Sequence, residues 1–197
     1  MTAFEKMHRS VSIYASFTKD ELETLNSFFT PAKLKKGDFF YEQGEVCKLF
    51  AFVASGCLRT FYISDKGEEF SIYFAFEGWW IGEPESFYSK GPSRHSCQVL
   101  ESCELLTADK KNFEAALDAI PPFREFYKRS TQRSYAVAQE KFAKAFSETA
   151  EEKYKKLLDK NPEMVLKIPQ VHIASYLGVK PQSLSRIRKK ILSEKKK

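Results

Sequence analysis

The two halves of this sequence differ in texture, and that difference constrains the fold more than any other feature. Seven of the eight glycines lie between residues 37 and 91, where short runs rich in Phe, Tyr, Val and Ile alternate with polar residues. Turn signals about every eight to twelve residues favour an antiparallel sandwich or barrel. After Pro121-Pro122 the chain runs to about Phe146 without glycine or proline, which indicates a long helix. The sequence therefore predicts an α+β chain with its strands first.

Local signals refine the first half. We expect strands at 49–53, 58–63 and 70–74, with a turn at Ser64–Gly67 between the last two. Residues 1–30 are expected to be helical and peripheral. Thr18 and Glu21 have the spacing of a capping box ahead of an apolar stripe.

The long helix of the second half has two interpretations. At 1.5 Å per residue, about 25 residues span about 37 Å, which is more than a small domain needs. The helix either forms a core under the sheet, or is half-exposed and pairs with its twin in a dimer. We favour the dimer, because the stripe along the helix is small and mixed in character rather than purely apolar. A second helix is expected at 151–159.

Charge separates the two halves as well. Residues 1–123 carry 13 basic and 18 acidic side chains, whereas residues 124–197 carry 19 basic and 8 acidic ones. Residues 167–197 hold nine basic side chains and a single acid, Glu194. A basic end on an acidic body favours nucleic acid as a partner, and the alternative is a solvated C-terminal extension.

Other functional classes lack support in the sequence. The four cysteines form no Cys-x-x-Cys pair, and Ser, His and acidic residues show no catalytic spacing, so we expect neither an enzyme nor a metal site. No run approaches 18 apolar residues and no basic-then-apolar leader is present, which predicts a cytoplasmic protein without membrane association.

Residues 170–189 have the pattern of a helix-turn-helix. Two helices that cross steeply need a small residue at their contact, and Ala174 supplies it. Gly178 follows four residues later, where the turn requires a positive φ. Pro181 falls at the expected start of the second helix, a position that tolerates proline. The apolar positions expected to face inward are Ile173, Leu177, Val179, Leu184 and Ile187.

The second of these helices has two faces. Leu184, Ile187 and Ile191 fall on one side, whereas Gln182, Arg186, Lys189 and Ser193 project from the other. Arginine can pair with guanine and glutamine with adenine, while hydroxyls and lysines suit phosphates. The alternative is an ordinary helical hairpin with a charged outer face, which the number of matched positions makes the weaker interpretation.

The segment IPQVHIASYLGVKPQSLSRIR, residues 168–188, resembles the winged helix-turn-helix of Crp/Fnr-type transcription regulators. The first half resembles the cyclic-nucleotide-binding β-roll of the same family in its runs Lys36–Asp38, Gln43–Glu45, Gly56–Arg59 and Glu77–Glu83. The similarity extends from about residue 20 to 192 and is greatest to regulators of Bacteroidetes-like bacteria.

The resemblance implies a complete architecture and a set of partners. An antiparallel β-roll of the double-stranded jelly-roll type (1–121) is followed by a dimerisation helix (122–147) and a winged helix-turn-helix domain (148–197). The implied partners are double-stranded DNA with a near-palindromic operator, a second copy of the chain, and RNA polymerase as a candidate. The residues expected to approach bases are Gln182, Ser183, Ser185 and Arg186, and those expected to hold phosphates are Lys180, Arg188, Lys189 and Lys190. The rival interpretation is a small-ligand sensor that acts through a protein partner with little DNA binding.

The expected ligand segment departs from the pattern of cAMP-binding relatives, which carry Gly-Glu and then Arg-Ser/Thr-Ala about ten residues later. Gly82-Glu83 matches the first part, but Ser93 takes the arginine register and Arg94 comes one position late, followed by His95. A slip of one residue turns a strand side chain to the opposite face. We therefore treat Gly82, Glu83, Ser93, Arg94 and His95 as the candidate ligand residues and cAMP as a doubtful ligand.

Three further features are given structural interpretations. Cys97 and Cys103 are expected to be buried small hydrophobes rather than a redox pair. Trp79-Trp80 is expected to plug the roll against a helix rather than to stack on a ligand. His172 is expected to lie near phosphate or solvent.

Overall fold

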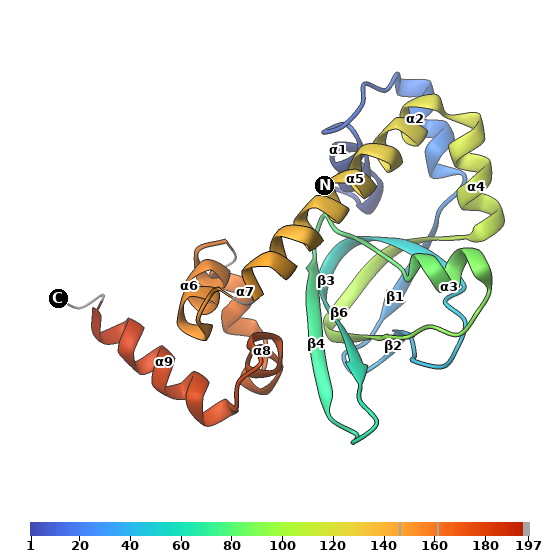
Figure 1. The fold of residues 1–197 in the computed structure, drawn as a ribbon. Helices are drawn as coiled ribbons and strands as arrows, with labels where there is room; N and C mark the ends of the chain where they lie inside the picture. Colours follow the sequence, from blue (N-terminus) through green and yellow to red (C-terminus); the bar gives the residue numbers. More distant parts are fainter. Residues whose placement is uncertain (146, 161, 195–197) are drawn as a thin grey trace.

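The computed structural model describes residues 1–145, 147–160 and 162–194 and has a β-rich and a helical part (Figure 1). The strands are β1 (Thr30–Leu34), β2 (Phe39–Tyr41), β3 (Leu49–Ile63), β4 (Glu69–Phe76), β5 (Trp80–Ile81) and β6 (Ser96–Asp109). The helices are α1 (Ala3–Val11), α2 (Lys19–Asn26), α3 (Pro84–Ser89), α4 (Lys110–Ala119), α5 (Pro121–Ala145), α6 (Ala150–Lys160), α7 (Pro162–Lys167), α8 (Gln170–Leu177) and α9 (Pro181–Glu194). The predicted α+β class is confirmed.

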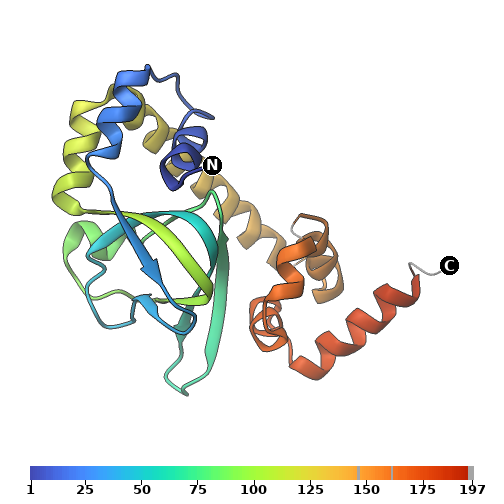
Figure 2. The same ribbon diagram turned by 180° about the vertical axis from the view of Figure 1, so that it is seen from behind.

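The strands form one antiparallel sheet that curls into a roll (Figures 1 and 2). The strand order is β1-β6-β3-β4, with β2 on β6 and β5 on β3. The long strands β3 and β6 pair from Leu49 opposite Asp109 to Phe61 opposite Ser96. They therefore form the centre of the sheet.

Strand β3 corrects one prediction. The runs at 49–53 and 58–63 belong to a single strand of 15 residues, not two. Gly56, at φ +91°, lies in a stretch where the register against β6 shifts, so bulges rather than a turn accommodate it. The predicted turn at Ser64–Gly67 is present, where the Gly67 N–H donates to the Ser64 carbonyl at 2.8 Å.

Two apolar cores lie on the two sides of the sheet. The inner side of the roll is filled by buried side chains that include Tyr41, Ala51, Val53, Leu58, Ile81, Cys97, Val99 and Leu105. The outer core joins the sheet to α1, α2, α4 and the start of α5. In it the Trp80 ring lies 5.2 Å from that of Phe126 and 6.0 Å from that of Phe123, both on α5. Trp80 thus plugs the roll against a helix, as the sequence predicts, whereas the prediction was wrong for Trp79, which is 43% exposed and lies outside this core.

Helix starts agree with their sequence signals. The Thr18 hydroxyl accepts from the Glu21 N–H while the Glu21 carboxylate accepts from the Thr18 N–H, which is the predicted capping box. Pro121 and Pro122 open α5, whose 25 residues match the predicted length. Phe146, the predicted end of the helix, lies outside the described residues.

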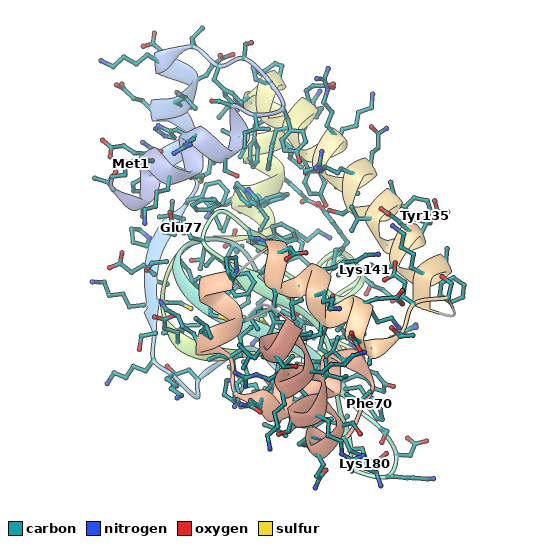
Figure 3. The ribbon with its side chains drawn as sticks, turned by 90° about the vertical axis from the view of Figure 1, so that its left-hand side faces the viewer. Met1, Phe70, Glu77, Tyr135, Lys141 and Lys180 are labelled. Carbon is teal, nitrogen blue, oxygen red and sulfur yellow. The ribbon has the colours of Figure 1, made fainter. Side chains whose placement is uncertain are left out.

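Helix α5 leaves the roll after its first turns. Phe123 and Phe126 are buried, but residues 131–144 are exposed throughout. Tyr135, Val137 and Phe142 are among the exposed apolar side chains, and Figure 3 shows Tyr135 pointing away from the body of the molecule. The half-exposed helix is therefore the correct description, and a helix buried along its length under the sheet is not.

The regular secondary structure of the C-terminal part is entirely helical in its described residues. After β6 the described residues contain no strand, so the β-hairpin wing implied by the resemblance is absent from them. Pro162 instead opens the short helix α7, and α9 continues to Glu194. Proline at a first turn and the many Lys, Arg and Leu residues in these segments favour helix locally. Among the described residues, no helix combines the length and apolarity that a membrane span requires.

Candidate nucleic-acid interface

The helix-turn-helix forms where the sequence predicts it, from α8, a short turn and α9. Gly178 ends α8 in the left-handed conformation at φ +68°, and its N–H reaches the Ala174 and Ser175 carbonyls. The Val179 N–H then donates to the Ala174 carbonyl at 3.0 Å. These bonds satisfy carbonyls that the end of the helix leaves without partners and turn the chain toward α9.

The predicted inward face is buried at Ile173, Leu177 and Leu184, whereas Val179 and Ile187 are half-buried and pack against it. Ala174 is 1% exposed at the crossing of the two helices, and Leu184 is fully buried. Ile173, Leu177 and Ile191 complete this core together with Tyr154 of α6 and Val165 of α7. This packing fixes the orientation of α9 and thereby of its polar face.

The opposite face of α9 is open to solvent. Gln182, Ser185, Arg186 and Lys189 are exposed, and Ser183 is half-buried. Lys180 precedes the helix and is also exposed. A hollow of about 180 Å³ lies beside this face, lined by Gln170, Ser185, Arg188, Lys189 and Leu192. Figures 1 and 2 show α9 on the side of the helical part away from the sheet, so the roll does not cover it.

Two of the residues expected to hold phosphates lie close to α6. The Lys190 ammonium pairs with the Glu151 carboxylate at 2.7 Å, and this hydrogen bond lowers the pKa of Glu151. Arg188 is half-buried near Tyr154, where burial raises the pKa of the tyrosine and the guanidinium opposes the rise. Sequence spacing alone did not reveal this, because both partners lie on a different helix.

The expectation for His172 was wrong. Its Nδ1 lies 2.6 Å from the Arg59 Nη1, which belongs to β3 of the roll. Arg59 is 1% exposed, so this contact lies inside the boundary between the roll and the helix-turn-helix. The sequence does hold a signal for it, since Leu58-Arg59-Thr60-Phe61 places a cation in the middle of a strand.

The Glu83 and Ser93 side chains of the candidate ligand segment have structural uses. Glu83 is 9% exposed, and its carboxylate accepts from the Ser86 N–H at 2.7 Å, so that it caps α3. Gly82 precedes it, with the Phe50 ring 2.4 Å from where a Cβ would stand. Ser93 is buried and its hydroxyl donates to the His95 carbonyl at 2.8 Å. Burial lowers the pKa of His95, and the Glu83 carboxylate opposes that effect.

Arg94 points outward, as its register predicts. Its side chain is 75% exposed and pairs with Glu85 at 3.1 Å. A cyclic phosphate inside the roll would need an arginine directed inward, whereas the inner side here is lined by apolar and aromatic side chains. The residues of this segment therefore do not fit a cyclic nucleotide in the manner of cAMP-binding relatives.

The cysteines are buried and reduced. Cys97 is fully buried and Cys103 is 2% exposed, and both lie within β6. Burial raises the pKa of the Cys97 thiol to about 12 and that of Cys103 to about 11. Such thiols behave as small hydrophobes, as predicted.

Comparison with known proteins identifies relatives for both parts of the chain. A family model described as the cyclic nucleotide-binding domain matches residues 31–119. The transcriptional activator protein anr of Pseudomonas aeruginosa is 24% identical over 184 residues, which cover 87% of this chain and 75% of the relative.

Solved structures share the fold over most of the chain. The catabolite activator protein of Thermus thermophilus aligns with a TM-score of 0.60 and 20% identity, over 92% of this chain and 87% of that one. A protein from Eubacterium rectale, described as a transcriptional regulator of the crp/fnr family, aligns with a TM-score of 0.68 and 16% identity, over 90% of this chain and 85% of that one.

Proposed function

We propose that this chain, a member of the Crp/Fnr family, is a sequence-specific DNA-binding transcription regulator that acts as a homodimer. Its division into a sensor roll (1–121), a dimerisation helix (122–147) and a DNA-binding domain (148–197) is part of the proposal. RNA polymerase is the candidate protein partner, and the cytoplasm is the proposed location.

One observation carries the proposal: the polar face of α9 is exposed and sits on a buried helix-turn-helix core. Gln182, Ser185 and Arg186 are the side chains of this face proposed to approach base edges. Lys180 and Lys189, also exposed, flank them and are proposed to contact phosphates. Ser183 and Arg188, both half-buried, stay in the proposed base and phosphate sets respectively. Lys190 remains in the phosphate set only if DNA displaces Glu151 from it.

The exposed half of α5 supports a dimer. Tyr135 is 66% and Val137 42% exposed, and such residues on a helix face that no described part of the chain buries favour a partner helix. A two-fold axis along this helix would give two α9 helices, which read successive major grooves about 34–36 Å apart on a near-palindromic operator.

Neighbouring lysines on α9 give a matched test. The experiment selects a duplex from a randomised pool and measures affinity at several salt concentrations for the parent chain, Lys189→Ala and Lys190→Ala. Losing one phosphate contact reduces the slope of log K against log salt by about 0.9. We expect this reduction for Lys189→Ala and a smaller one for Lys190→Ala, because Lys190 pairs with Glu151.

A third variant tests base recognition. Arg186→Ala should cost about 1–3 kcal/mol on the selected duplex and relax the preference at one base pair. An unchanged base profile for Arg186→Ala, or equal slopes for the parent chain and Lys189→Ala, would contradict the assignment of this face. Failure to select any duplex would instead support the rival function, a sensor that acts through a protein partner.

A further inference from the structure

The helix-turn-helix docks on the outer face of the roll through α8. The Ser175 hydroxyl accepts from the Ser71 N–H of β4 at 2.9 Å and donates to the Glu69 carbonyl at 2.7 Å. The Tyr176 ring lies 5.5 Å from that of Phe74, also on β4. Cys57, Phe74 and Phe76 of the sheet share one apolar core with α6 to α9. The docking surface therefore combines a continuous apolar core with directional hydrogen bonds between the Ser175 hydroxyl and the β4 backbone.

A buried arginine lies at the edge of this surface. Arg59 is 1% exposed, and its guanidinium carbon stands 3.9 Å above the centre of the Phe61 ring. One terminal nitrogen, Nη2, donates to the Glu69 carboxylate at 2.7 Å and to Gln98 at 3.4 Å. The other, Nη1, donates to His172 Nδ1 at 2.6 Å. The guanidinium thus connects three strands of the roll to α8.

The contact between Arg59 and His172 fixes the protonation state of the imidazole. Arginine keeps its proton at all ordinary pH values and can only donate. His172 Nδ1 must therefore accept, which requires a neutral ring with its proton on Nε2. A second proton on the ring would remove the acceptor and set two cations 2.6 Å apart.

Other charged groups at this surface do not reverse that effect. Glu69, from β4, is the acid that acts on His172, but its carboxylate is held by Arg59. Lys141, from α5, places its ammonium 5.7 Å from the Tyr176 ring, beside the C-terminal helices in Figure 3. Lys167 pairs with Glu101 of β6 at 3.1 Å. Burial and Arg59 both lower the pKa of His172 from its ordinary 6.5, and Glu69 opposes them.

We propose that the Arg59–His172 contact is a proton-sensitive latch that holds the helix-turn-helix on the roll and opens when His172 is protonated. The sign follows from linkage: the docked state has the lower pKa, so it binds fewer protons than the released state. Docking is at full strength above about pH 6.5 and weakens as the pH falls from there toward the lowered value, by up to about tenfold per pH unit.

The Ser71 amide reports on the latch directly. Its N–H donates to Ser175 across the boundary, so it is protected only while α8 is docked. The test measures hydrogen exchange of this amide by NMR at about pH 7.5 and about pH 5.5, corrected for the intrinsic rate. We expect protection to fall at acid pH while amides in the β1–β6 ladder stay protected, and the midpoint to coincide with the titration of the His172 ring.

Three variants separate the latch from general acid sensitivity. In His172→Gln a neutral amide oxygen can accept from Arg59, so Ser71 should stay protected at both pH values. In His172→Lys a permanent cation faces Arg59, so Ser71 should exchange fast at both. His8→Gln is the matched control, because His8 contacts Asn26 in the peripheral helices, and it should respond as the parent chain does.

Two results would overturn the proposal. One is an acid-induced loss of Ser71 protection in His172→Gln equal to that of the parent chain. The other is a midpoint that differs from the His172 titration in the parent chain, a measurement that needs no variant. Neither depends on DNA, so the outcome is independent of the proposed function.

Discussion

Gly56 and Gly44 allow backbone strain to be separated from close packing in the roll. Their φ angles are nearly equal, +91° and +90°, in the region that L side chains rarely adopt. A Cβ at position 44 would meet nothing within 4 Å, whereas a Cβ at position 56 would lie 2.5 Å from the Ser102 carbonyl oxygen and 2.6 Å from the Cys103 sulfur. The destabilisation caused by the two alanine substitutions should therefore differ mainly through the packing of the added Cβ atom.

The magnitudes follow from these contacts. Gly44→Ala should lower the free energy of unfolding by about 1–2 kcal/mol, because alanine is strained in the left-handed backbone conformation. Gly56→Ala should cost the same and, in addition, about 1–3 kcal/mol because β3 and β6 must move apart at the bulge. The expected total for Gly56→Ala is thus about 2–5 kcal/mol, a large part of the stability of a typical domain.

Urea unfolding followed by tryptophan fluorescence measures both values, because Trp79 and Trp80 lie in the roll and report on that part of the chain. The midpoint and the slope m give the free energy of unfolding for each variant. If Gly44→Ala and Gly56→Ala are equally destabilising, the close approach of the two strands relaxes at no cost and the packing argument is refuted.

Three further predictions use other contacts. Ser175→Ala should weaken docking by about 1–3 kcal/mol, because the Ser71 N–H loses its acceptor. Faster exchange of that amide would show it, and unchanged exchange would count against the docking geometry. Calorimetric titration with cAMP or cGMP should give no binding heat, and Arg94→Ala should behave as the parent chain does, because this side chain pairs with Glu85 at the surface. Heat that disappears in Arg94→Ala would prove that the side chain reaches a bound phosphate. A thiol reagent at about pH 8 should not modify Cys97 in the folded chain, because burial raises its pKa to about 12. Mass spectrometry with and without denaturant tests this, and modification of the folded chain would refute the burial argument.

Local signals account for the parts of the molecule that could be predicted. Ala174, Gly178 and Pro181 specify the helix-turn-helix because a close crossing, a positive φ and a first turn each depend on a few adjacent residues. The outward direction of Arg94 follows equally from strand register.

Contacts between distant segments account for the errors. His172 is 113 residues away from Arg59 in sequence, so the cation within β3 indicates a buried arginine but does not indicate which residue it contacts. The division of β3 at Gly56 was wrong because the same residue type serves both turns and bulges. Lys190 was expected to face DNA, but its partner Glu151 belongs to a helix whose placement depends on tertiary packing.

The docking of α8 on β4 gives the chain the mechanics of a truss. The roll, α5 and the C-terminal helices form three members, and each touches the other two: α5 is set in the roll through Phe126, α8 rests on β4, and Lys141 of α5 meets Tyr176. Because each of the three members contacts the other two, their relative orientations are fixed even if each single contact is flexible. While α8 stays docked, these three contacts fix the direction of α9 relative to α5. If the contact of α8 with β4 opens, the triangle of contacts is no longer closed, and in the proposed dimer the distance between the two α9 helices is no longer fixed.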